Sequence, residues 1–394
     1  MCRRIRYWNR KQRRGQVVAI TAVSATMLIG FSALAIDLGV LYVARAELQR
    51  TADAAALAGS WELLLDENRL DGDNGAALAV SDSRGKVVEV AAKNPVLNTT
   101  IVVDPNAANA PDGDIVFGSL ADTADQDEAI QLGTDSATNT VSVLVRRDSV
   151  RNGPVPLLFA QIFGLATSEV SARAAAAFEG GVVGYRVTAE TGNAQILPFS
   201  LQVDSWNDLL SGIVTQGDNY AYDPETGTVS AGSDGVLELN IFPGAGTDQL
   251  PPGNFGTVDI GASNNSTADL ARQIVHGITE ADLAYIGGAL VFDENGELTL
   301  EGDTGISAGM KDELASIIGQ PRSIPLFRSV SGNGNNSEYT IVGFAGIRIL
   351  AVKLTGAMKK KYVVVQPAIV VDDSVITEAG ASNSYVYAPP RLIR

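Results

Sequence analysis

The sequence is almost without cysteine and histidine. Cys2 is the only cysteine and His276 the only histidine among 394 residues. A single cysteine excludes disulfides within the chain and any zinc site that needs several thiolates. Histidine and cysteine also supply many of the nucleophiles, proton-transfer groups and metal ligands of enzymes, so their scarcity disfavours catalysis. We expect His276 to be an ordinary packed or exposed side chain.

Phosphate-binding and nucleophile motifs are missing as well. The sequence contains no G-x-S-x-G, no G-x-x-x-x-G-K-[ST], and no G-x-G-x-x-G that follows a strand and opens a helix. The sequence therefore predicts a non-catalytic protein with no cofactor.

Basic residues are scarce outside the first fourteen positions. Residues 1–14 hold seven of the 29 basic groups and no acidic one, which leaves 22 basic against 45 acidic groups in the rest. A body this acidic repels phosphate backbones, so we predict no binding to nucleic acid. The basic tail, residues 1–16, is instead suited to an anionic membrane leaflet.

One long uncharged stretch follows the tail. Residues 17–36 contain 20 uncharged and mainly apolar residues. At about 1.5 Å per residue, a helix of this length spans roughly 30 Å, the thickness of the hydrocarbon core of a bilayer. By the positive-inside rule the tail stays in the cytoplasm, so the sequence predicts a single-pass protein of the inner (cytoplasmic) membrane whose body lies in the periplasm or outside.

A cleaved signal peptide is the alternative to a retained anchor. Ala33-Leu34-Ala35 has the A-x-A pattern of a signal-peptidase site. The apolar run is longer than an ordinary signal core of about 7–15 residues, and the helical pattern continues through Ala35. We therefore expect the anchor to be retained.

The helical pattern continues over residues 37–65, the expected stem. Apolar residues recur there at steps of three and four, which is the spacing of one helix face. This narrow, alanine-rich stripe suits packing against another helix, as in a homo-oligomer, or against the chain's own body. The stripe consists of Leu38, Leu41, Ala44, Leu48, Ala52, Ala55 and Ala58.

Small residues also recur inside the membrane segment. Ala22, Thr26 and Gly30 lie four apart, a spacing that lets two membrane helices approach closely, although it also arises by chance in an alanine-rich segment. Asp37 comes directly after the apolar run. It is expected either to mark the water boundary or to pair with a neighbouring subunit.

These N-terminal residues resemble a known family. Arg13-Arg14-Gly15-Gln16, the apolar run, and residues 35–59 closely resemble the N-terminal domain, about residues 13–60, of TadG-like proteins of the tight-adherence (Flp, type IVc) pilus assembly systems. The resemblance implies a retained membrane anchor and contacts with other pilus-assembly or pilin subunits. The matching positions are Asp37, Gly39, Tyr42, Arg45, Leu48, Gln49, Asp53 and the run 54–58.

One position departs from the pattern of the processed pilins. Those chains are cut after a glycine and carry a glutamate at the fifth position of the mature chain. A cut after Gly15 would instead place Ile20 there. The sequence thus favours an assembly component or a minor-pilin-like protein over the major filament subunit.

The remaining chain predicts an α+β fold in two regions. Residues 66–181 read as mixed helices and strands, and residues 182–394 read as mainly antiparallel strands with two helices, of which one starts after Ser266. The expected strands include 86–92, 100–103 and 140–147 in the first region, and 196–203, 235–242, 255–260, 289–293, 339–354 and 361–371 in the second. The last two have a short connection and predict a hairpin.

Candidate metal sites have ordinary structural explanations. Asp259 and Ser263 belong to a segment that resembles the D-x-S-x-S loop of von Willebrand A domains, but Gly261 replaces its first serine. Acidic clusters at 71–75, 112–114 and 122–128 have the oxygen ligands that calcium prefers, without the spacing of an EF-hand. We expect turns and solvated loops at these positions.

Two functional hypotheses follow. The first is a membrane-anchored, non-catalytic component of a Tad/Flp pilus assembly or adhesion system that acts by protein–protein contacts outside the cytoplasm. The alternative is a tethered cell-surface adhesive or ligand-binding module unrelated to pilus assembly.

Overall fold

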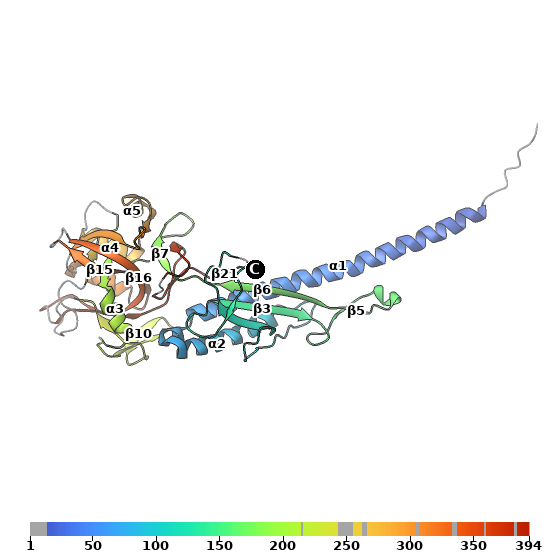
Figure 1. The fold of residues 1–394 in the computed structure, drawn as a ribbon, viewed down its shortest axis with the longest axis horizontal. Helices are drawn as coiled ribbons and strands as arrows, with labels where there is room; N and C mark the ends of the chain where they lie inside the picture. The colour runs from blue at the N-terminus through green and yellow to red at the C-terminus, as the bar shows by residue number, and fades with distance from the viewer. Residues whose placement is uncertain are drawn as a thin grey trace, which may run out of the picture.

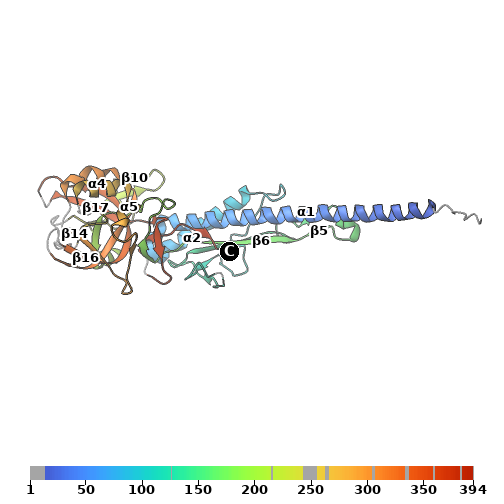
Figure 2. The same ribbon diagram turned by 90° about the horizontal axis from the view of Figure 1, so that it is seen from above.

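The fold is α+β, with one long helix that projects from an elongated body (Figure 1). The computed structural model describes residues 14–125, 127–213, 216–242, 255–261, 266–303, 307–332, 337–357, 360–381 and 384–393. Helix α1 (Arg14–Leu65) has 52 residues and confirms the helix that the sequence predicts through the apolar run and the stem. Figure 2 shows its N-terminal half extending away from the body, while its C-terminal half lies against it.

The other helices are shorter. Helix α4 begins after Ser266, whose hydroxyl accepts a hydrogen bond from the Asp269 N–H at 3.2 Å, and this confirms the predicted cap. The helices and 3₁₀ turns are η1 (Glu67–Asp71), α2 (Gly72–Lys93), η2 (Ala160–Phe163), α3 (Val203–Leu210), α4 (Thr267–His276), α5 (Glu280–Ala284), η3 (Ala308–Met310) and α6 (Lys311–Ser316).

A five-stranded antiparallel sheet lies against the body half of α1. Its order is β2 (Gln131–Leu132), β1 (Ile115–Ser119), β3 (Thr140–Arg147), β6 (Val170–Ala177) and β21 (Arg391–Leu392). The predicted strand at 140–147 is confirmed, and all eight of its residues pair with β6.

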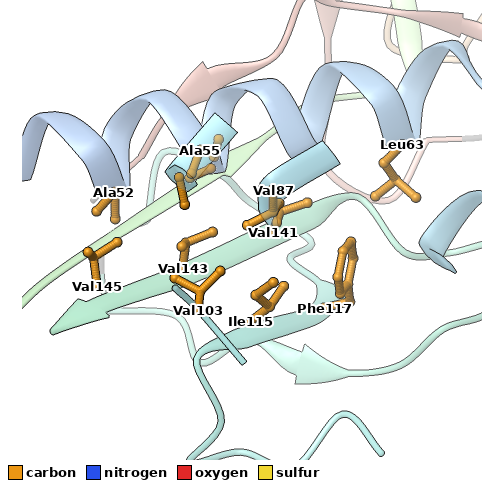
Figure 3. Close-up of a cluster of buried hydrophobic side chains, with 14 of the residues drawn as sticks. Ala52, Ala55, Leu63, Val87, Val103, Ile115, Phe117, Val141, Val143 and Val145 are labelled. Carbon is orange, nitrogen blue, oxygen red and sulfur yellow. The ribbon is translucent and has the colours of Figure 1, made fainter. Parts of the chain in front are cut away.

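The core of this part lies between the helices and the sheet (Figure 3). Helix α1 contacts α2, β3 and β6. Ala52 and Ala55 of α1 and Val87 of α2 are fully buried together with Val143 and Ile115 of the sheet. From Ala44 to Ala55 the alanine-rich stripe therefore packs on the chain's own body, which is one of the two alternatives that the sequence leaves open, while Leu38 is exposed.

Two expected strands of this region are wrong. Residues 86–92 belong to α2, because Ala76, Val80, Val87 and Ala91 are buried at helical spacing against α1. Residues 100–103 form no strand. The isolated bridge between Val96 and Thr99 lies just before them.

Residues 182–386 form mainly strands. Seven are joined in the order β11 (Leu239–Asn240), β17 (Tyr362–Pro367), β16 (Ser337–Lys353), β14 (Leu298–Asp303), β12 (Phe255–Val258), β8 (Phe199–Gln202) and β15 (Pro321–Ser331). Because β15 also pairs with β16, five of these strands close into a ring. The expected hairpin of 339–354 and 361–371 is confirmed by the antiparallel pairing of β16 and β17.

Smaller sheets surround this ring. They are β13 (Leu290–Val291), β7 (Val182–Tyr185) and β19 (Val375–Thr377) in one three-stranded sheet, and the pairs β9 (Tyr220–Asp223) with β10 (Thr228–Ala231), β18 (Val370–Val371) with β20 (Val386–Tyr387), and β4 (Val155–Pro156) with β5 (Thr167–Ser168).

The two parts of the chain are joined by more than the backbone. Strand β21 returns from the second part and pairs with the C-terminal end of β6. Arg348 of β16 is 3% exposed in its side chain, and its guanidinium binds the Glu67 carboxylate of η1 at 2.7 Å. The same guanidinium lies 3.3 Å from the ring centre of Tyr222. A largely buried ion pair thus joins η1 to the second part.

Candidate functional site

The N-terminal part of α1 has the properties of a membrane anchor. Among the described residues, α1 is the one helix long and apolar enough to cross a bilayer, and its apolar window is not buried by the rest of the chain. Thr21, Thr26 and Ser32 each donate a hydroxyl hydrogen bond to the carbonyl four residues earlier, at 2.8, 2.9 and 2.9 Å. The segment therefore exposes apolar surface, and these three hydroxyls are satisfied within the helix, as lipid requires.

The predicted small-residue face lies on this uncovered part. Ala22, Thr26 and Gly30 are exposed, and a Cβ atom added at Gly30 would meet nothing within 4 Å. Their role in helix–helix contact stays a prediction.

Asp37, the first residue beyond the apolar run, binds a loop 121 residues away. Its carboxylate is buried and accepts hydrogen bonds from the backbone N–H groups of Leu158, Phe159 and Ala160, with shortest distances of 2.7, 3.0 and 2.6 Å. These groups open η2, so the carboxylate caps its N-terminal turn. Burial favours the protonated form, but the three amides outweigh it and lower the pKa of Asp37. Both carboxylate oxygens are thus bound by the chain itself.

We call residues 153–168, which contain this turn, the apolar loop. Strands β4 and β5 form its base, η2 its tip, and Gly164 ends η2 in the left-handed conformation with φ of 84°. The loop carries no charged residue. In Figure 1 it extends past the end of β3 and β6 along the free part of α1. The mainly apolar residues 157–163, between Pro156 and Gly164, predict a short helix, and the structure shows a one-turn 3₁₀ helix over Ala160–Phe163 with exposed apolar side chains.

The other predicted anchor residues lie on the stem. Arg45 is exposed beside a shallow concavity that Leu38, Leu41, Tyr42 and Glu169 also line. Asp53 accepts a hydrogen bond from the Gln49 side chain at 2.7 Å, and the same Gln49 amide reaches the Arg173 carbonyl of β6 at 3.3 Å. Asp53 and Gln49 thus lie where the stem meets the sheet.

Gly59 marks the closest approach of α1 to α2. A Cβ atom there would lie 2.4 Å from Val87 Cγ2 and 3.3 Å from Val141 Cγ1. The Ser83 hydroxyl of α2 donates a hydrogen bond to the Gly59 carbonyl at 2.7 Å. Only glycine permits this contact without displacing a neighbour. The alanine-rich pattern of the stem gives no signal for this contact.

The acidic clusters have protein partners. Asp114 is fully buried and binds Arg146 at 2.6 Å and Arg151 at 3.0 Å. Asp73 accepts the Ser136 N–H at 3.0 Å, and hydrogen bonds from the Ser136 side chain and from this N–H lower the pKa of Asp73. The described residues include no group of three or more histidine, cysteine or acidic side chains arranged for a metal.

Of the two weak metal candidates, Asp259 lies among the described residues. The Asp259 N–H bonds the Glu301 carbonyl at 2.7 Å, within the ring of strands. Ser263 lies outside the described residues. His276 is exposed at the end of α4, and its carbonyl accepts a hydrogen bond from the Asn193 side chain at 2.9 Å.

The comparisons with known proteins concern the anchor, the stem and the first sheet. Residues 15–62 match the family described as putative Flp pilus-assembly TadE/G-like, and residues 44–176 match the family described as putative Tad-like Flp pilus-assembly. No curated protein and no solved structure matches the chain. The second match ends one residue before the end of β6, so the two matches together cover α1, α2 and the sheet strands β1 to β3 and nearly all of β6. Residues 15–176 of the chain are thus similar to Flp pilus-assembly families, and both matches end before residue 177.

Proposed function

We propose that this protein is a membrane-anchored, non-catalytic component of a Tad/Flp pilus assembly or adhesion system, minor-pilin-like in its architecture. The observation that carries the proposal is the continuity of α1. Its first half is apolar and is not covered by the rest of the chain. In its second half, Ala44, Leu48, Ala52 and Ala55 are fully buried in the body. A rigid connection of this kind carries the body outward from a membrane.

Orientation and retention of the anchor are part of this proposal. The seven basic groups of residues 1–14 favour a cytoplasmic N-terminus, which places the body in the periplasm or outside. Residues 33–35 lie inside the unbroken helix α1, and Asp37 two residues later is bound to the apolar loop. A signal peptidase would have to unwind this helix to cut after Ala35, so the structure supports a retained anchor.

Contacts with other exported proteins are the proposed mode of action. The partners are other pilus-assembly or pilin subunits, in keeping with the matched families. Ala22, Thr26 and Gly30 form the proposed face for a second copy or another membrane helix. Region 66–181 is proposed as an α+β part of the body and region 182–394 as its β-rich C-terminal domain, and the stem over residues 37–65 packs with the first.

The test of topology uses the native cysteine. In cells that produce the full chain, Cys2 should react with a membrane-impermeant maleimide only after permeabilisation. A Tyr285→Cys chain in a Cys2→Ser background should react from the outside, because Tyr285 is 73% exposed on the body. Labelling of Cys2 in intact cells would reject the orientation. The intact mass of the membrane-extracted chain should include the residues before Val17, and a chain that starts at Ile36 would show cleavage and release.

The test of function compares pili with adhesion. The tagged full chain, cross-linked in cells, should co-purify with identified Flp pilins or assembly proteins, and its deletion should reduce the number of Flp pili seen by electron microscopy. Loss of surface attachment with unchanged pili would favour the tethered adhesive module instead.

A further inference from the structure

The apolar loop exposes large apolar side chains that its own fold leaves uncovered. Leu158, Ile162, Phe163 and Leu165 are 58%, 77%, 83% and 61% exposed. They lie within a segment of 16 uncharged residues. A contiguous apolar tip of this kind on a folded protein marks a surface that is covered by something else.

The position of the tip identifies what lies beside it. Asp37 binds the N–H groups that open η2, so the tip lies beside the first residue beyond the apolar run of α1. Within residues 17–36 only Ala33, one turn earlier, is partly covered by the rest of the chain. Helix α1 also contacts η2. The tip therefore lies at the level of the last turn of the segment that is long enough to span a bilayer.

The charges near the loop show which lipid chemistry it suits. The loop has no basic residue of its own, and the preceding Arg151 binds Asp104 at 2.8 Å and Asp114 at 3.0 Å. No cation of the tip is thus available for an anionic headgroup. The contact would depend on apolar burial at the boundary between headgroups and acyl chains, with little dependence on salt or on lipid charge.

We propose that the tip of the apolar loop inserts into the outer-leaflet interface of the bilayer that α1 spans, as a second membrane contact of the chain. This inference rests on the anchoring part of the proposed function and goes beyond it. A single helix leaves the body free to rotate about the helix axis and to tilt. A second contact, held against α1 by Asp37, restricts both motions and presents one face of the body away from the membrane.

The test measures depth with a fluorophore on the full chain. The Cys2→Ser chain, reconstituted in phosphatidylethanolamine and phosphatidylglycerol vesicles, receives a single label at Gln161→Cys, which is exposed on η2 and leaves the apolar side chains in place. Insertion of roughly 5–10 Å should lower the iodide quenching constant by about threefold or more relative to a label at Tyr285→Cys. Lipids with a nitroxide near the headgroup should quench the label at 161 and not the label at 285.

Two variants and one further label make the result decisive. Phe163→Asp should return iodide quenching at 161 to the level at 285, whereas Phe163→Leu should leave it low. Equal iodide quenching at 161 and 285 would overturn the proposal. Protection from iodide without quenching by nitroxide lipids would also overturn it, because the tip would then contact protein. A label at Leu28→Cys should be quenched by deep nitroxide lipids in every case, and its failure would reject the anchor itself together with the loop contact.

Discussion

Replacing Gly59 by alanine tests the close approach of α1 and α2. The added Cβ atom would lie 2.4 Å from Val87 Cγ2, closer than carbon atoms can approach, so either the β-branched Val87 or a helix has to move. Overpacking of this kind lowers the free energy of unfolding by about 1–3 kcal/mol, while alanine in place of glycine inside a helix raises it by about 1 kcal/mol. We expect Gly59→Ala to lower the free energy of unfolding by roughly 1 kcal/mol.

Gly85 of α2 is the matched control. It lies on the same pair of helices, is exposed, and has nothing within 4 Å of an added Cβ atom. Gly85→Ala should therefore stabilise this part of the protein by about 0.5–1 kcal/mol. The difference between the two variants isolates the steric term, because the gain in helix propensity is common to both.

Hydrogen exchange of the Val141 and Val143 amides on β3, in the detergent-solubilised full chain, reports the stability of this core separately from the ring of strands. Adding Val87→Ala to Gly59→Ala should give a combined loss smaller than the sum of the two single losses, by about 1–2 kcal/mol. Equal stabilisation by Gly59→Ala and Gly85→Ala would refute the close approach, and additive losses would show that Val87 is not the obstacle.

Three further predictions concern charged groups. Asp37→Asn should speed amide exchange in the apolar loop. Since folding lowers the pKa of Asp37, its contribution to the stability of the loop is complete above the unfolded pKa of about 3.9 and is lost as pH falls through the lower folded value. A pH series from 7 to 4 should therefore leave the loop attached to α1, and release near pH 6 would contradict this. Arg348→Met leaves Glu67 without its ion-pair partner and should lower the free energy of unfolding in urea by about 3 kcal/mol, whereas Arg328→Met, at an exposed pair, should change it by less than about 1 kcal/mol. Millimolar calcium should leave the melting temperature unchanged, because Asp114 already binds two arginines; a rise of several degrees would show a calcium site in the acidic loops.

The parts of the fold that the sequence predicts correctly have strong local signals. Helix α1 follows from 20 uncharged residues and a regular apolar stripe, and β3 follows from the alternation at 140–147. The β-branched run around Val87 and Val88 led instead to a wrong strand, because its helical face becomes visible only with Ala76, Val80 and Ala91 included. Packing against α1 therefore overrides the local strand propensity of these residues and makes the segment helical.

Other features have no local signal. Strand β15 is not among the predicted strands. Pro321 and Pro325 lack the N–H group that a sheet ladder uses, yet both residues pair with β16. The partner of Asp37 lies 121 residues away, and no periodicity predicts that contact. The apolar loop differs in this respect, since all 17 residues between Arg151 and Glu169 are uncharged, which is unusual in so acidic a body.

The arrangement of β6 has a mechanical consequence for a protein that carries its body on a helix. In Figure 1 the strands β3 and β6 run along the same axis as α1, with the ring of strands beyond their far end. The backbone passes from this sheet to the ring after Ala177 of β6 and comes back before Arg391 of β21. These two residues pair with each other, so both connections lie at the same end of the sheet. A pull on the outer part therefore loads the eight paired residues of β3 and β6 in shear, so that their hydrogen bonds resist together instead of opening one after another. In the proposed membrane-anchored arrangement, tension would thus pass from the second part to α1 without peeling the sheet apart.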